Sequence, residues 1–378
     1  MALFRKGLFG RITSVLRKLS AFLAPLALAG TVQAQDAPDP PFSGQAKAEV
    51  VATLGEKLRS NYVFPQIAES ASATLARLSA NGKYDGIDNP QAFADALRGD
   101  LREAGNDRHL QVRYDPSFRE MSPEERGAAP SEKEVRETRR QLGMQAFGIH
   151  RVARLPGNVG YLDVRFFGPT EFVAPGYEAA MQMLSGMSAV IIDLRSNGGG
   201  DPASVAQLAS HFFAQGDERH LNSIYNRVED TTRDFWTVRS AAPRYTGPVF
   251  VVTSDYTFSG GEELAYDLQT QERATLVGET TGGGANPGEP MSLGHGFYAF
   301  IPTGRAINPV TGKNWEHVGV KPDHPIAAEE ALVEAYRLAL VEVARNEPDA
   351  PTRAEYEALA KSELSDIAEL PRWKHPRE

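Results

Sequence analysis

Two glycine-containing segments of the sequence could surround a reactive group. The first, Ser196-Asn-Gly-Gly-Gly-Asp201, directly follows the apolar run 189–195. Consecutive glycines after a buried strand let the backbone turn sharply and point free N–H groups into a cleft. Such a turn can hold a phosphate or the oxyanion of a reaction intermediate, and an ordinary tight turn is the alternative.

Two nucleotide-binding motifs do not fit this first segment. A P-loop requires Gly-Lys followed by Ser or Thr, and no such residues follow Gly200. A dinucleotide-binding turn requires spaced glycines, whereas those at 198–200 are consecutive. On its own, the segment leaves oxyanion binding and a plain turn open.

The second segment, Thr257-Phe-Ser-Gly-Gly-Glu-Glu263, places a serine at the expected start of a helix. The apolar run 249–253 precedes it, and we expect the helix to begin at about Gly260. The unpaired N–H groups and the dipole of a helix N-terminus favour a developing negative charge, so Ser259 could act as a nucleophile. The alternative is that Ser259 only caps the helix.

The composition excludes several other kinds of chemistry. The chain has no cysteine, which rules out thiol catalysis and thiolate metal sites. No histidine pair has a metal-ligand spacing such as HExxH, so we expect neither a metal nor another cofactor. The net charge of −9 argues against nucleic acid as a partner.

Residues 1–34 are expected to be an export signal. They combine an apolar stretch, 19–29, with Val32-Gln-Ala34, the small-x-small pattern of a cleavage site. Because the stretch is shorter than the ~20 residues needed to span a bilayer, a membrane anchor is the weaker alternative. We therefore expect a periplasmic protein that does not stay inserted in the membrane after signal cleavage. The start of this segment carries the basic residues Arg5, Lys6, Arg11, Arg17 and Lys18.

The mature chain is expected to start with a small helical domain. A proline-rich linker, 35–42, leads to three stretches with apolar residues at helical spacing, which predict a helical domain over 43–114. Asn89-Pro90 is typical of a helix start, with Asn as the cap. The polar, charged residues 115–150 are expected to form a linker or lid with a helix near 132–140.

The second half of the chain alternates between strand and helix patterns. Strands are predicted near 159–167, 189–195, 248–253, 274–278 and 296–301, with helices near 202–214 and 260–272. Such alternation indicates an α/β domain, which we place at 151–325. A helical tail is expected over 326–378.

Four motifs of the sequence match one known family in order and spacing. They are Asp193-Leu-Arg-Ser-Asn-Gly-Gly-Gly200, Thr257-Phe-Ser-Gly-Gly-Glu-Glu263, Val277-Gly-Glu-Thr-Thr-Gly-Gly-Gly284 and Asn314-Trp-Glu-His-Val-Gly-Val-Lys-Pro-Asp323. The chain resembles the tail-specific (carboxyl-terminal-processing) serine peptidases, a superfamily that includes the tricorn core protease and the repeats of interphotoreceptor retinoid-binding protein. Ser60-Asn-Tyr-Val-Phe-Pro65 also resembles the amino-terminal domain of the retinoid-binding-like branch.

The resemblance implies a fold and a set of roles. It implies an α/β catalytic domain of the ββα, crotonase/ClpP-like kind, preceded by a small three-helix domain. Ser259 matches the family nucleophile, and the N–H of Gly260, with that of Gly199 or Gly200, matches the oxyanion hole. Peptides or proteins are then the expected substrates. The sequence predicts no particular oligomeric state.

The sequence departs from the family at the general base. Many tail-specific proteases carry a lysine on the turn where this chain has Gly284, and Asn286 occupies a position that is often histidine in this branch. Resemblance to the serine, histidine and glutamate arrangement of tricorn-like members instead suggests His109 as the base and Glu316 as its support. The nearest rival bases are Lys313 and His317.

Two further expectations concern specificity and the alternatives to peptidase activity. Only residues 115–150 lie between the helices and the α/β domain, fewer than the ~50 of a small domain, so we predict no peptide-binding PDZ domain and no recognition of free carboxyl termini. A non-catalytic module that binds apolar ligands, like the retinoid-binding relatives, is the alternative function. An esterase or acyl hydrolase that uses the same serine is a second alternative.

Overall fold

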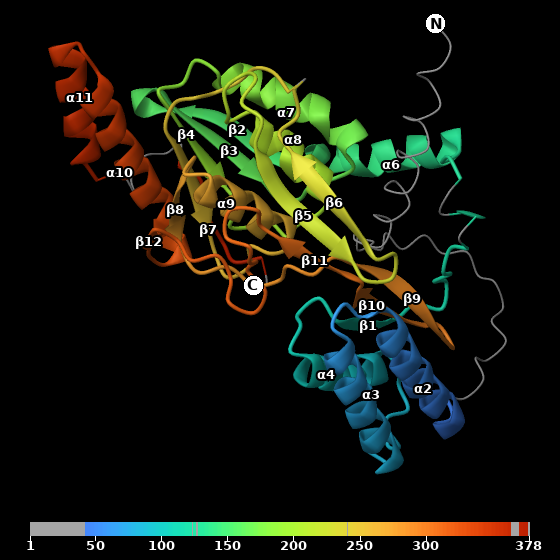
Figure 1. The fold of residues 1–378 in the computed structure, drawn as a ribbon. Coiled ribbons are helices and arrows are strands. Elements are labelled where there is room, and N and C mark those ends of the chain that lie inside the picture. The colour runs from blue at the N-terminus through green and yellow to red at the C-terminus, as the bar shows by residue number, and fades with distance from the viewer. Residues whose placement is uncertain (1–41, 123, 126–127, 240, 364–369, 377–378) are drawn as a thin grey trace, which may run out of the picture. The chain divides into compact units, whose positions relative to one another are not determined.

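The computed structural model describes residues 42–378 except 123, 126–127, 240, 364–369 and 377–378 (Figure 1). The expected export signal, 1–34, and all but the last residue of the expected linker 35–42 lie outside the described residues. The chain divides into two compact units. The first takes the residues up to Ala129 together with Ile224–Thr232 and Asn286–Arg305, and the second takes the remainder.

The first unit contains the predicted three helices, α2 (Gly44–Asn61), α3 (Pro65–Ala80) and α4 (Pro90–Gly105). The side chain of Asn89 accepts a hydrogen bond from the Ala92 N–H at 2.9 Å, and Pro90 follows it, as the sequence predicts for this helix start. The helices bury their apolar faces together, because these faces carry the leucines and aromatic residues at helical spacing.

A three-stranded antiparallel sheet completes the core of the first unit. Its order is β1-β10-β9, formed by β1 (Gln111–Tyr114), β10 (Phe297–Pro302) and β9 (Gly288–Gly294). Phe297 and Ile301 of β10 join the same buried cluster as the helix residues. The core of this unit therefore depends on strands that come almost two hundred residues after its helices in the chain.

The second unit is built around a six-stranded sheet of order β12-β8-β7-β4-β3-β2. Neighbouring strands are parallel except β2, which is antiparallel to β3. The strands β3, β4 and β7 are buried along their whole length, which explains their nearly continuous apolar sequences. The strands are β2 (Ile149–Leu155), β3 (Val159–Val164), β4 (Ala189–Asp193), β7 (Val249–Thr253), β8 (Thr275–Gly278) and β12 (His324–Pro325).

Helices cover the sheet of the second unit. Helix α10 (Ala328–Asn346) packs against β3, β4, β7 and β8, and α11 (Ala350–Ala360) packs against α10 (Figure 1). Helix α7 (Thr170–Leu184) contacts β2 and β3, whereas α9 (Gly260–Thr270) contacts β8 and packs on α8 (Pro202–Ser210).

Other elements complete the described chain. Helix α6 (Glu132–Met144) lies where the sequence predicts a helix, and Ser131 and Glu134 form a capping box at its start. A third sheet has the strand order β11-β5-β6. Its strands are β11 (Gly304–Ile307), β5 (His220–Asn226) and β6 (Thr231–Trp236). Each of these strands has residues assigned to both units. Across the described residues, none of the helices is both long and apolar enough to cross a membrane.

Candidate active site

The two glycine-containing segments meet at the carboxyl ends of neighbouring strands in the second unit. Strands β4 and β7 are parallel and in register, with Asp193 beside Val252, so the chain leaves both at the same edge of the sheet. Beyond the strands, the Thr257 hydroxyl donates to the Leu194 carbonyl at 2.8 Å. The Phe258 N–H donates to the Asn197 carbonyl at 3.0 Å. These bonds hold the turn that carries Ser259 against the glycine-rich loop, 196–200.

Glycine is required where the two turns touch. A side-chain Cβ at Gly199 would lie 2.7 Å from the Ser259 Cβ, closer than real Cβ contacts allow, and 3.0 Å from the Gly260 nitrogen, which is tighter than most real contacts. A Cβ at Gly260 would lie 3.0 Å from the Gly200 nitrogen. The backbones therefore approach each other as closely as an oxyanion-binding turn requires.

The amides of these glycines differ in what they bind. The Gly199 N–H donates to the Asn197 Oδ1 at 2.8 Å and is therefore already engaged. Among the described residues, no hydrogen bond uses the N–H of Gly200 or of Gly260. Of the donors expected from the sequence, the pair Gly200 and Gly260 is the one with N–H groups available to a ligand.

Ser259 has a backbone conformation that is rare for a residue with a side chain. Its φ of 51° and ψ of −119° lie in a sparsely populated region, which costs about 1–3 kcal/mol and persists only where the surroundings enforce it. Helix α9 starts at the next residue, and the Ser259 side chain is only partly buried. The serine is thus neither sealed in the core nor fully in water.

The buried carboxylate of Glu262 enforces this conformation. It accepts the Ser259 N–H at 2.8 Å, the Thr281 hydroxyl at 2.5 Å, and the N–H groups of Gly283 and Gly284 at 2.7 and 2.8 Å. Burial raises the pKa of Glu262 to about 7, although these four hydrogen bonds favour the ionised form. Glu262 therefore joins the nucleophile candidate to the second glycine turn, 281–284.

The second glycine turn also binds the Trp-Glu-His segment, residues 315–317, through hydrogen bonds. The Gly283 carbonyl accepts the His317 N–H at 3.0 Å, and the Gly284 carbonyl accepts the Trp315 indole N–H at 2.8 Å. The Glu316 carboxylate accepts the Ala285 N–H at 2.5 Å, and its side chain is 6% exposed. Glu316 thus belongs to the same unit as Ser259 and is fixed through this turn.

The rival bases Lys313 and His317 also lie in the second unit. The Lys313 side chain is exposed. The His317 side chain is 39% exposed, and its Nδ1 lies 3.6 Å from the Glu316 Oε1. Both are therefore more open to water than Glu316.

His109 belongs to the first unit, between α4 and β1. It is 6% exposed, its backbone N–H donates to the Asp107 Oδ1 at 2.8 Å, and burial lowers the pKa of its imidazole to about 4. Asp107 also accepts the hydroxyl of Tyr62 and the side-chain amide of Asn286, at 3.0 and 3.1 Å. The roles of His109 and Glu316 stay predictions.

Two residues of the site were not singled out by the sequence analysis. Asn197 is fully buried, and its side chain bridges the Val164 carbonyl and the Gly199 N–H. Glu262 holds the Ser259 turn, as described above. The signal for both is a polar residue within a glycine-containing turn, where neighbouring amides need acceptors. Within either unit taken by itself, the described residues hold no cluster of three or more His, Asp or Glu placed to bind a metal.

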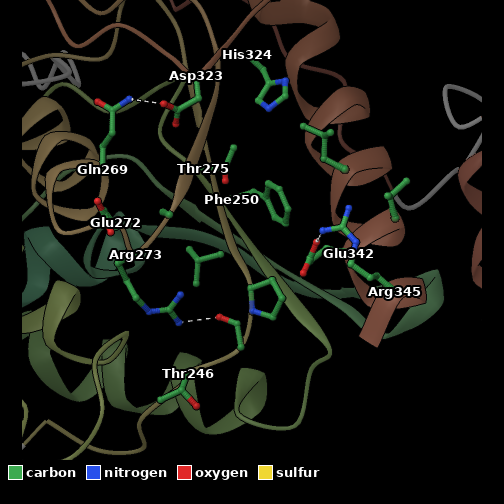
Figure 2. A pocket seen from close by; sticks show the side chains of 16 residues that line it. Thr246, Phe250, Gln269, Glu272, Arg273, Thr275, Asp323, His324, Glu342 and Arg345 are labelled. Atoms are coloured by element: carbon green, nitrogen blue, oxygen red, sulfur yellow. Dashed lines mark hydrogen bonds and ion pairs between the residues drawn. The ribbon is translucent and has the colours of Figure 1, made fainter. Parts of the chain in front are cut away.

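A cavity of about 680 Å³ lies at the opposite, amino-terminal end of the sheet (Figure 2). The first residues of β7 and β8, Val249 and Thr275, line it, together with part of α10. In its lining, Arg345 pairs with Glu342 at 2.8 Å, and Asp323 accepts a hydrogen bond from the side-chain amide of Gln269 at 2.9 Å. Because the cavity lies at the first residues of the strands, it is separate from the carboxyl edge of the sheet, where Ser259 lies.

Two consecutive stretches of the chain match known family domains. Residues 158–326 match the family described as Peptidase family S41. Residues 44–149 match the domain described as the N-terminal domain of Peptidase S41 in eukaryotic IRBP.

Curated relatives match the chain over part of their length. It is 27% identical over 190 residues to carboxyl-terminal-processing peptidase 2, chloroplastic, of Arabidopsis thaliana, covering 47% of this chain and 34% of that protein. It is 27% identical over 168 residues to carboxy-terminal processing protease CtpB of Bacillus subtilis, covering 44% of this chain and 33% of that protein. The matches thus span about a third of these relatives.

Solved structures share the fold at low sequence identity. A structure described as mature CPAF matches with a TM-score of 0.54 and 13% identity, covering 81% of this chain and 99% of that one. A lipoprotein from Streptococcus agalactiae matches with a TM-score of 0.50 and 14% identity, covering 80% of this chain and 97% of that one. These likenesses bear on the fold alone.

Proposed function

Because the chain belongs to peptidase family S41, we propose that it is a serine peptidase in which Ser259 attacks the carbonyl carbon of a peptide bond. The observation that carries the proposal is the strained backbone of Ser259 at the start of α9, in close contact with the glycine-rich loop 196–200. Beside it, the N–H groups of Gly200 and Gly260 make no hydrogen bond to another described residue. A nucleophile on such a turn presents its hydroxyl to substrate instead of burying it.

The N–H groups of Gly200 and Gly260 stabilise the oxyanion in this proposal. The tetrahedral intermediate places a negative charge on the former carbonyl oxygen, and fixed backbone donors meet that charge without reorganising. The dipole of α9 adds to the effect, because Ser259 precedes its first turn. Loss of one such donor typically costs about 10²–10³ in rate.

His109 is the proposed proton acceptor for Ser259, with Glu316 as its support. Burial lowers the pKa of His109 to about 4, so its imidazole is neutral at pH 7, the form in which a histidine acts as a general base. The proposal requires His109 to lie within hydrogen-bonding reach of Ser259 in the reacting enzyme. If substitution of His109 leaves the peptidase rate unchanged, His317 and Lys313 are the alternative general bases.

We further propose that residues 1–34 direct export and that the enzyme works in the periplasm on peptide or protein substrates. The basic start, the short apolar stretch and the Val32-Gln-Ala34 pattern support this part. The amino-terminal sequence of the protein recovered from a periplasmic fraction tests it. A chain that still carries its first 34 residues would contradict it.

A fluorophosphonate probe tests the nucleophile. We expect the probe to label the protein and labelling to disappear in Ser259→Ala, with Ser254→Ala as a control because that hydroxyl is buried and donates to the Arg195 carbonyl. Peptide and ester substrates compared side by side then separate a peptidase from an esterase. A protein that neither labels nor hydrolyses either substrate would instead support the non-catalytic binding module.

A further inference from the structure

The end of the chain lies against the segments that form the candidate active site. After α11, the described residues 370–376 reach the carboxyl edge of the sheet in the second unit. The Trp373 indole N–H donates to the Ser196 Oγ at 3.0 Å, and Ser196 is the first residue of the glycine-rich loop. The segment 370–376 therefore contacts the loop whose amides are proposed to hold the oxyanion.

The residue before Ser196 gives Trp373 a rigid surface to pack on. The Arg195 guanidinium lies 5.4 Å from the centre of the Trp373 ring, at a distance typical of a cation–π contact. Arg195 is 1% exposed and is held by Asp193 at 2.6 Å and by the Ala328 carbonyl at 2.7 Å. Because the guanidinium cannot move freely, the indole is fixed relative to the end of β4.

A second contact reaches the segment that leads to Ser259. The His375 Nε2 lies 2.8 Å from the Asp255 Oδ1, and the His375 ring meets the Tyr256 ring edge-on at 5.9 Å. Asp255 and Tyr256 connect β7 with the turn of the nucleophile. Leu370, at the other end of the segment, is buried in the core beside α10. The segment 370–376 thus contacts the glycine-rich loop and the residues that lead to Ser259, and its first residue is buried in the core.

We propose that Trp373 and His375 are positioning residues, which hold the glycine-rich loop and the Ser259 turn in the geometry that catalysis requires. The proposal rests on the proposed function of Ser259. Three consecutive glycines have a large conformational freedom, so the loop needs fixed points on both sides. Asn197 fixes its later half through the Gly199 N–H, and Trp373 fixes its first residue.

Displacement of the loop affects the reaction more than it affects substrate binding. The Gly200 N–H has to face the oxyanion, and a misplacement of about 1 Å can cost about 10²-fold in rate. Trp373 and His375 touch neither Ser259 nor the two amides themselves. Their loss should therefore lower kcat and leave KM nearly unchanged, whereas loss of a substrate contact would raise KM.

Steady-state kinetics of Trp373 variants test the proposal. We expect Trp373→Ala to lower kcat by at least about tenfold with KM changed less than about threefold. Trp373→Phe, which keeps a ring but loses the indole N–H, and Ser196→Ala should each have a smaller effect, and their double variant should be no worse than either alone. Trp236→Ala is the matched control, because Trp236 is an exposed tryptophan that stacks on His220. A kcat within twofold of the parent in Trp373→Ala would overturn the proposal.

Hydrogen exchange gives a readout that does not depend on activity. Amides of residues 196–200 should exchange faster in Trp373→Ala than in the parent or in Trp236→Ala, while those of β4 stay protected. Unchanged exchange in the loop would overturn the proposal even if the parent proves inactive. If the parent fails to react with the fluorophosphonate probe but its loop responds as expected, the proposed peptidase function fails and the positioning contact stands.

Discussion

At the scale of single residues, the conformation of Ser259 depends on a neighbouring glycine and on a buried carboxylate. Its φ of 51° is possible because Gly199 leaves room beside it and Glu262 binds its N–H. The sequence singles out Ser259, Gly199, Gly200 and Gly260 through the resemblance of their motifs to the family, because the glycines alone fit an ordinary tight turn as well. Which amide is available could not be predicted, since that depends on the Asn197 side chain.

Gly199→Ala tests the close approach of the two turns. The added Cβ would lie 2.7 Å from the Ser259 Cβ, at a φ of +102°, so the turns must separate. We expect peptidase kcat to fall by about 10² or more and the free energy of unfolding to fall by about 1–3 kcal/mol. Gly216→Ala is the matched control: its φ is +83°, but nothing lies within 4 Å of the added Cβ. It should lose stability and keep kcat; equal kcat losses in both variants would contradict this account.

The protonation of Glu262 should control the acid side of the pH profile. Burial raises its pKa to about 7, and below this pH a proton on the carboxyl would compete with the N–H groups that it accepts. We expect kcat/KM to rise as the pH increases through about 7 and Glu262→Gln to lower it by about 10-fold or more while removing that transition. Glu178→Gln, at an exposed position of α7, serves as the control. An acid limb near pH 4 in the parent would instead point to His109, whose pKa is about 4.

At the scale of secondary structure, how well an element could be predicted follows from its surroundings. Strands β4 and β7 are buried on both faces and read as continuous apolar runs, and α10 repeats apolar residues at helical spacing. Strand β6 (Thr231–Trp236) has most of its residues exposed, so it lacks the regular alternation of apolar and polar residues that indicates a half-buried strand. Helix α7 was also missed: it contains Pro175, which usually argues against a helix interior.

Helix α9 carries two buried acids one turn apart, Glu263 and Asp267. Burial raises the pKa of Glu263 to about 8, and burial together with the Glu263 charge raises that of Asp267. Between about pH 4.3 and pH 8 the folded protein therefore keeps a proton on Glu263 that the unfolded chain has lost. Since the folded state binds more protons, the free energy of unfolding should fall as the pH rises, by up to about 1.4 kcal/mol per pH unit.

Glu263→Gln tests this linkage, because an amide of the same shape never ionises. We expect urea unfolding to show a gain in stability at pH 8 relative to the parent and a smaller difference at pH 5. Glu178→Gln, at an exposed position of α7, should leave the pH dependence unchanged. A variant whose stability falls with pH as steeply as the parent's would show that Glu263 does not carry this pH dependence.

At the scale of the whole molecule, the two units contain different parts of the predicted machinery. Ser259, its glycines and Glu316 lie in the second unit, and His109 lies in the first. The helices of the first unit were predictable from their apolar spacing. The return of residues 286–305 to that unit was not, because the strand pattern near 296–301 says nothing of its partner strand.

His109→Ala tests whether the first unit contributes the general base. We expect kcat to fall by about 10²–10⁴, the usual contribution of a general base, with little change in thermal stability of the second unit. His317→Ala and Lys313→Ala are the matched comparisons and should stay within about threefold of the parent. If His109→Ala stays within that limit and His317→Ala does not, the base comes from the Trp-Glu-His segment.

The discontinuous make-up of the first unit sets an order of events during synthesis. Its helices emerge from the ribosome early, but the central strand of its sheet, β10, ends only at Pro302. Until that strand has been made, the apolar faces of α2 and α4 lack part of the surface that covers them. The core of the first unit therefore stays incomplete until most of the chain has been translated. For the same reason, a fragment that stops at residue 129 should be unable to fold alone.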